Sequence, residues 1–113
     1  MRSARVLAAG LLLTTVCTVA AACSSGSTPA APSDDPTLVE GQRIYSSNCA
    51  SCHGSKGEGG YGKKLAGVVA TKYPNVDDQI ALIANGKGAM PSFSQKLTAE
   101  QLSAVTRYTR EVL

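Results

Sequence analysis

A five-residue stretch near the middle of the chain, Cys49-Ala50-Ser51-Cys52-His53, constrains the fold more than any other feature. Two residues separate its thiols, and an imidazole directly follows the second thiol. This is the attachment pattern of c-type haem, in which both sulfurs bond to the haem vinyl groups and the histidine ligates the iron. His53 is the only histidine of the chain. We therefore predict one covalently bound haem c, attached through Cys49 and Cys52, with His53 as an axial iron ligand.

Three other uses of these side chains make different demands on the sequence. A structural zinc site needs four ligands, usually from a second Cys or His pair, which the sequence lacks. A thioredoxin-like dithiol is expected inside a βαβ unit, and no strand pattern flanks Cys49. A disulfide across two residues would be strained, and it would leave His53 without a role. A haem-free thiol oxidoreductase that uses Cys49 and Cys52 remains the alternative to test.

The composition favours a small fold built around a cofactor. A length of 113 residues corresponds to one domain. Four Tyr, one Phe and no Trp supply little material for a large apolar core, and short domains usually need a disulfide, a metal or a cofactor. Without Arg2 and Arg5, the chain carries nine Lys or Arg against eight Asp or Glu, a net charge of +1. We therefore predict no nucleic-acid binding, and nothing indicates more than a monomer.

The N-terminal residues have the layout of an export signal. Arg2 and Arg5 precede an apolar run, and Cys23 follows in a setting that resembles the lipobox of bacterial lipoproteins. We expect residues 1–22 to be a signal peptide that is cleaved before Cys23, with Cys23 lipidated. The domain would then be anchored to the outer face of the cytoplasmic membrane, on the periplasmic or cell-wall side. The alternative, an uncleaved anchor, has to span a bilayer with fewer than the roughly 20 apolar residues required.

The segment after Cys23 is rich in small and turn-forming residues. Residues 23–35 contain Ser, Pro, Ala and Gly but no large apolar side chain. Such a composition predicts a flexible tether, which would hold a domain of residues 36–113 about 20 Å from its anchor point. That confinement would raise the local concentration of the domain near membrane-bound redox enzymes.

Capping residues predict three helices in the domain. Asp35 and Pro36 begin the first, which extends to about residue 47, and Asn75 begins the second, which ends near Gly86. Thr98 begins the last helix, with a capping box completed three residues later.

Two further features concern packing and the loop after the haem motif. Gly41 is expected to allow a close crossing of the first helix by the last, near Tyr108. The pattern Gly57-Glu58-Gly59-Gly60-Tyr61-Gly62 matches a dinucleotide fingerprint, but it lacks the strand that such a site requires.

Met90 is the only methionine besides the initiator. A methionine in a small protein is most often a core residue. This one lies in a glycine-rich loop directly before Pro91, and a haem with one histidine ligand needs either a second ligand or an open site. We predict that Met90 is the distal axial ligand. If it is not bound, the open iron would suit a haem enzyme or a gas sensor.

Together these residues resemble class I cytochrome c, most closely the small membrane-anchored lipoprotein cytochromes c of Gram-positive bacteria. The resemblance extends from about residue 37 to the end of the chain and includes the haem motif, the Met90 loop and Tyr108. It implies an all-α fold of three to four short helices around the haem, with the first and last helices crossing. One departure concerns the proline whose carbonyl accepts a hydrogen bond from the proximal imidazole in many members. Here Gly62-Lys63-Lys64-Leu65 occupies that region, which leaves the partner of His53 open.

The resemblance implies a respiratory electron carrier rather than an enzyme. With both axial positions filled, the natural chemistry is one-electron transfer from a quinol-oxidising complex, quinol–cytochrome c reductase, to a terminal cytochrome c oxidase. All six lysines fall between the haem motif and the last helix. We expect transient docking of acidic partners on lysines near the haem edge, the alternative being ordinary solvated side chains. The predicted docking residues are Lys56, Lys63, Lys64 and Lys87.

Overall fold

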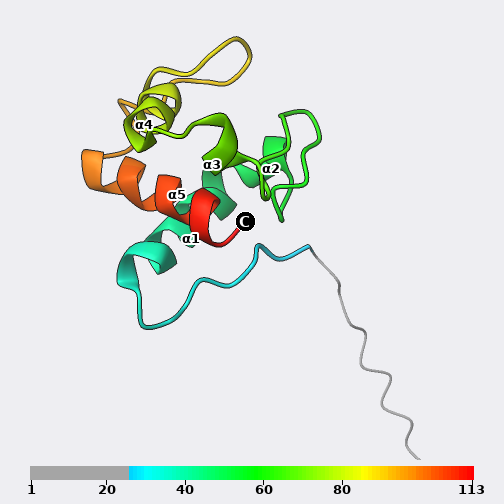
Figure 1. The fold of residues 1–113 in the computed structure, drawn as a ribbon, viewed down its shortest axis with the longest axis vertical. Helices are drawn as coiled ribbons and strands as arrows, with labels where there is room; N and C mark the ends of the chain where they lie inside the picture. Colours follow the sequence, from blue (N-terminus) through cyan, green and yellow to red (C-terminus); the bar gives the residue numbers. More distant parts are fainter. Residues whose placement is uncertain (1–25) are drawn as a thin grey trace, which may run out of the picture.

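The computed structural model describes residues 26–113, which form five helices and no strand (Figure 1). The helices are α1 (Pro36–Asn48), α2 (Ala50–His53), α3 (Val69–Lys72), α4 (Val76–Asn85) and α5 (Ala99–Glu111). The predicted all-α class is confirmed. The described residues form five helices rather than the expected three to four, because two of the five, α2 and α3, are additional single turns. Within the described range, no helix has the length and apolarity needed to cross a bilayer. The predicted signal peptide and Cys23 lie outside the described residues.

The three longer helices begin at the residues that the sequence predicted. The Asp35 carboxylate accepts hydrogen bonds from two main-chain N–H groups in the first turn of α1. Asn75 caps α4 through the N–H of Asp77, at 3.0 Å. Thr98 and Gln101 form both bonds of the capping box at the start of α5. These bonds satisfy N–H groups that have no partner inside the helix, which is why these helices begin where they do.

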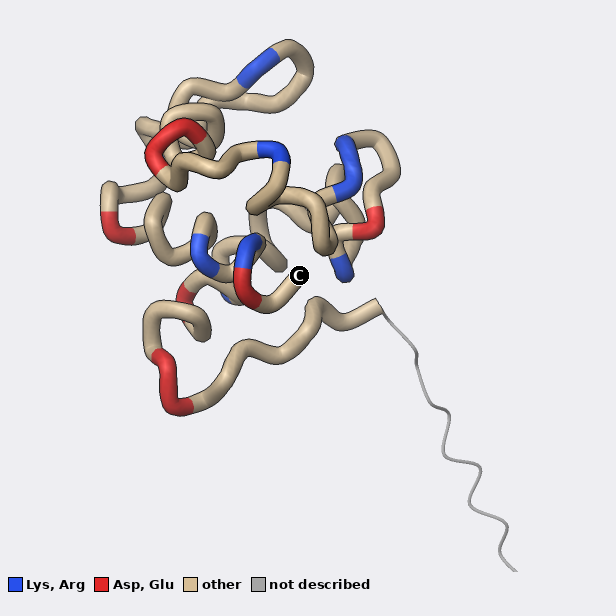
Figure 2. Tube along the Cα trace, in the orientation of Figure 1, with Lys and Arg blue, Asp and Glu red and all other residues tan. Residues whose placement is uncertain are grey.

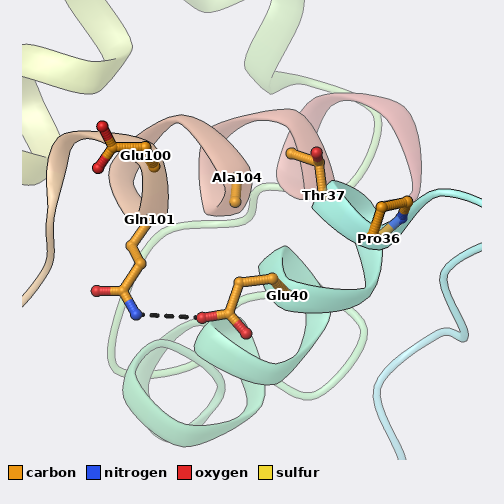
Figure 3. A pocket seen from close by; sticks show the side chains of 6 residues that line it. All are labelled: Pro36, Thr37, Glu40, Glu100, Gln101 and Ala104. Atoms are coloured by element: carbon orange, nitrogen blue, oxygen red, sulfur yellow. Dashed lines mark hydrogen bonds between the residues drawn. The ribbon is translucent and has the colours of Figure 1, made fainter.

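The core is built where α1 crosses α5 (Figure 1). At the crossing, a Cβ added to Gly41 would overlap the Ala104 carbonyl and lie 2.8 Å from Tyr108 Cβ. The rings of Tyr45 and Tyr108 are fully buried, with centroids 5.5 Å apart and planes inclined at 43°. The prediction that Gly41 permits a close crossing is confirmed. At the edge of the crossing, Gln101 donates to Glu40 beside a shallow pocket between the two helices (Figure 3).

The segment before α1 lies against the two crossing helices. We call residues 28–35 the N-terminal strap. The Tyr108 hydroxyl donates to the Pro29 carbonyl at 2.5 Å, and the Ala31 N–H donates to the Gln42 side chain at 2.8 Å. Thr28 lies within hydrogen-bond distance of Ser46, at 2.8 Å. The composition predicted a flexible tether over residues 23–35. Most of the bonds described here use main-chain groups of the strap, which amino-acid composition does not reveal.

Candidate functional site

The cysteine–histidine motif forms one turn of helix directly after α1. The main-chain N–H groups of Cys52 and His53 both donate to the Cys49 carbonyl, at 3.1 and 2.9 Å. Residues three apart in a helix share a face, so Cys49 and Cys52 present their thiols on the same side of this turn. Gly54, at φ 84°, ends the turn, and its carbonyl accepts a hydrogen bond from the buried Tyr45 hydroxyl at 2.7 Å. The core crossing therefore fixes the position of the motif, and both cysteines are free and half-buried.

His53 has a main-chain hydrogen-bond partner. Its Nδ1 lies 2.7 Å from the Lys63 carbonyl oxygen. Because a carbonyl only accepts, Nδ1 carries the proton, and the Nε2 lone pair remains available for a metal. The Gly62 N–H donates to the Cys52 carbonyl at 2.7 Å, which holds this loop against α2. The partner that the sequence left open is thus a main-chain carbonyl, supplied without a proline.

Met90 lies in a tight loop that is fixed to the end of α4. The main chains of Lys87 and Met90 exchange two hydrogen bonds of 3.1 Å. Gly86 begins the turn at φ 72°, and an added Cβ there would lie 2.5 Å from the Met90 carbonyl oxygen. The Phe93 N–H then donates to the Ala84 carbonyl at 3.1 Å. Glycine at position 86 and the return to α4 together set where the methionine lies.

The motif and the methionine loop open onto one cavity of about 580 Å³, a size typical of cofactor sites. Its wall includes Cys49, Cys52, His53 and Met90, together with apolar side chains of α4, α5 and the loops. Two free thiols, an imidazole with its metal-binding nitrogen free and a thioether beside apolar walls suit a covalently held haem. The residues therefore fit haem c, and axial ligation by His53 and Met90 stays a prediction.

The lysines around this cavity differ from the predicted set by one residue. Lys63, Lys64 and Lys87 line it, as the docking prediction requires, whereas Lys56 does not. Lys72, which the prediction omitted, does line it. Figure 2 shows the positive segments on the loops around α2 and α3 and on the loop after α4. Lys72 was missed because it lies neither in the loop after the haem motif nor in the Met90 loop, and only the fold of α3 brings it to the cavity.

The environment of Cys49 disfavours thiol chemistry. Burial, with a smaller contribution from Cys52, raises the pKa of Cys49 to about 11. Reactive cysteines need the thiolate form, which such a pKa makes scarce at neutral pH. In addition, no group of three or more His, Cys, Asp or Glu side chains is placed to share a metal ion within residues 26–113.

The chain matches a family model of the cytochromes c. The model is described as cytochrome c oxidase, cbb3-type, subunit III, and the match covers residues 36–108. This range begins at the first residue of α1 and ends inside α5, so it contains every residue that lines the cavity except Thr109.

Curated proteins and solved structures agree with this match. Cytochrome c6 of Nostoc sp. strain PCC 7120 is 40% identical over 85 residues, covering 73% of this chain and 74% of that protein. The cbb3-type oxidase subunit FixP of Azorhizobium caulinodans is 32% identical over 70% of this chain but only 28% of its own length. The crystal structure of cytochrome c6C from Synechococcus sp. PCC 7002 superimposes with a TM-score of 0.54 and 31% identity, covering 62% of this chain and 89% of that one.

Proposed function

The chain belongs to the cytochrome c family as a class I monohaem member, and from this premise we propose that it carries electrons to a terminal oxidase. The family establishes an electron carrier with covalent haem c, not an enzyme. The proposal adds the partners, quinol–cytochrome c reductase as donor and cytochrome c oxidase as acceptor. The likeness to FixP, a subunit of a cbb3-type oxidase, supports an oxidase as the acceptor.

The observation that carries the proposal is the opening of His53 and Met90 onto one cavity from two separate elements. The bound haem would supply a one-electron couple at its iron. With His53 and Met90 both bound to the iron, the chain would leave no coordination position for a substrate. A methionine ligand also raises the reduction potential, which suits electron delivery to an oxidase.

Four exposed lysines border the same cavity and give it a positive rim: Lys63, Lys64, Lys72 and Lys87. None of them forms an ion pair with a described carboxylate. Unpaired positive charge at the haem edge favours an acidic partner and speeds its approach at low salt. We place the docking surface on these four residues, with Lys72 in place of Lys56.

Export and lipid anchoring at Cys23 complete the proposal. The basic start, the apolar run and the cysteine that follows support an exported protein held at the outer face of the cytoplasmic membrane. Mass spectrometry of the mature protein tests this part. An N-terminal diacylated Cys23 is expected, and a mature chain that retains residues 1–22 would contradict it.

Ligand binding to the native protein tests the axial assignment. The ferrous protein should bind carbon monoxide slowly and weakly, because Met90 has to leave first. Met90→Ala should bind it rapidly, since no second methionine lines the cavity among the described residues and could take the vacated position. Rapid binding by the unmodified protein would instead favour the open-site enzyme or sensor.

Charge reversal tests the docking surface. Replacing Lys63, Lys64, Lys72 and Lys87 by Glu should lower the rate at which the protein reduces the oxidase at low salt. The dependence of this rate on salt concentration should also become weaker. Lys56→Glu is the matched control, because Lys56 is also exposed but does not border the cavity. Unchanged turnover in the fourfold variant, or an equal loss in the control, would remove the proposed surface.

A further inference from the structure

A buried chain of hydrogen bonds lies in one wall of the haem cavity. The Arg110 guanidinium donates to Gln79 Oε1 at 3.0 Å, and Gln79 Nε2 donates to Thr109 Oγ1 at 2.8 Å. The Thr109 hydroxyl donates onward to the Thr106 carbonyl at 2.9 Å. Gln79 and Thr109 are each 5% exposed, and both line the cavity. Two polar side chains therefore occupy a wall that is otherwise largely apolar.

The direction of every bond in this chain is fixed by its donor. Arg110 can only donate, so Gln79 must present its oxygen to Arg110 and its amide nitrogen to Thr109. Arg110 makes a second bond to the Tyr73 carbonyl, at 2.8 Å, which ties the start of α4 and the end of α3 to α5. Bonds that run in one direction polarise one another, and the effect is stronger where water is excluded.

The charge of Arg110 has no compensating carboxylate among the described residues. Of the three arginines in residues 26–113, Arg43 pairs with Glu40, and Arg107 pairs with Asp35 and Glu111. Arg110 instead bonds only to neutral oxygens. Arg110 does not line the cavity itself, but it bonds directly to Gln79, which does. A charge separated from a low-dielectric cavity by one buried side chain acts on groups inside it more strongly than a solvated charge does.

We propose that Gln79 is a positioning residue that holds the unpaired charge of Arg110 directly behind the wall of the haem cavity, where this charge raises the reduction potential of the haem. The inference rests on the proposed function, because it requires a redox-active haem in that cavity. Ferric iron carries one more positive charge than ferrous iron, so a fixed nearby cation destabilises the oxidised state. Arg110 and the methionine ligand would then both favour the reduced form of the haem.

Spectroelectrochemical titration of the purified holoprotein tests the proposal. Arg110→Gln should lower the midpoint potential, whereas Arg110→Lys, which keeps the charge, should lower it less. Gln79→Glu has nearly the same shape but neutralises Arg110, so it should also lower the potential. Arg43→Gln is the control, because Arg43 is exposed on α1 and pairs only with Glu40. The midpoint potential of the Arg43→Gln variant should match that of the unmodified protein.

Two results would overturn the proposal. In one, Arg110→Gln and Gln79→Glu keep the unmodified potential while their spectra remain low-spin. In the other, Arg43→Gln shifts the potential as far as Arg110→Gln, which would make the effect one of overall charge. If Arg110→Gln does not fold, Gln79→Glu decides alone. Failure of the carrier function itself would appear separately, as an open-site spectrum in the unmodified protein.

Discussion

The Nδ1 atom of His53 lies 2.7 Å from the main-chain carbonyl oxygen of Lys63. This contact fixes both the proton and the orientation of the imidazole, and outer hydrogen bonds of this kind tune the metal that a histidine ligates. Because the acceptor belongs to the main chain, the side chain of Lys63 can change without losing it. The residue that controls the contact is the neighbouring Gly62, which packs against the ring.

Gly62→Ala should therefore disturb the iron site without removing a ligand. An added Cβ would lie 2.9 Å from both Cε1 and Nδ1 of His53, so the ring must tilt or the loop must move. We expect a weaker methionine-to-iron charge-transfer band and a shifted midpoint potential, both measured on the holoprotein. Gly60→Ala is the matched control, since its Cβ would meet only the Cys52 carbonyl at 3.4 Å. Identical spectra for Gly62→Ala and the unmodified protein would show that the contact does not tune the iron.

Gly41→Ala should destabilise the helix crossing. The new methyl group would overlap the Ala104 carbonyl, and overpacking of this kind costs about 1–3 kcal/mol, occasionally more. The change also gains about 1 kcal/mol of helix propensity, so we expect a net loss of about 2 kcal/mol for an overlap this close. Chemical denaturation measures it, with the exposed Ser47→Ala on the same helix as control. A stabilised Gly41→Ala variant would mean that the helices do not approach this closely.

Tyr108→Phe should release the N-terminal strap. The substitution removes the bond to the Pro29 carbonyl, which is worth about 1 kcal/mol net. Hydrogen exchange of the Ala31 amide, which donates to Gln42, should then become faster. The control is Tyr61→Phe, because Tyr61 is 85% exposed. If the Ala31 amide exchanges equally fast in the unmodified protein, the strap does not remain docked in solution.

The α1–α5 contact should weaken in acid. Hydrogen bonds from Arg43 and then Gln101 lower the pKa of Glu40 to about 2, from an ordinary value of 4.5 (Figure 3). A depressed carboxyl pKa contributes stability above the unfolded value, and this contribution is lost as the pH falls from 4.5 towards 2. Across that pH range, thermal unfolding should show a smaller loss of stability in Glu40→Gln than in the unmodified protein.

An exposed carboxylate provides the reference for this pH dependence. The Asp34 side chain is exposed and makes no hydrogen bond or ion pair with another described residue, so Asp34→Asn is the matched control for the loss of one carboxylate. An unchanged acid response in Glu40→Gln would show that the carboxylate does not support the crossing.

The features that the sequence predicted well are those with a local signature. Asp35, Asn75 and Thr98 cap helices through their own side chains, and Gly41 marks a crossing because no other residue is so small. Met90 was also recognisable as a candidate, because its loop combines glycines with a following proline. Each of these signals depends on residue type and spacing alone, so no tertiary contact had to be known.

The features that escaped prediction depend on main-chain groups or on tertiary placement. The Lys63 carbonyl and the Pro29 carbonyl are acceptors that any residue would supply, so residue type carries no information about them. Lys72 and Gln79 reach the cavity only because α3 and α4 fold back onto α5. Residue type and spacing therefore predict the attachment motif, whereas only the folded chain reveals what surrounds it.

The central claim is a covalent haem c with His53 and Met90 as axial ligands, and one measurement tests it most directly. Optical spectra of the exported, purified protein should be recorded in both oxidation states, with the intact mass taken after denaturation. We predict a mass that includes one haem, a low-spin spectrum and a methionine-to-iron charge-transfer band that vanishes in Met90→Ala. Covalent haem without that band would contradict the axial assignment, and a mass without haem would contradict the carrier function altogether.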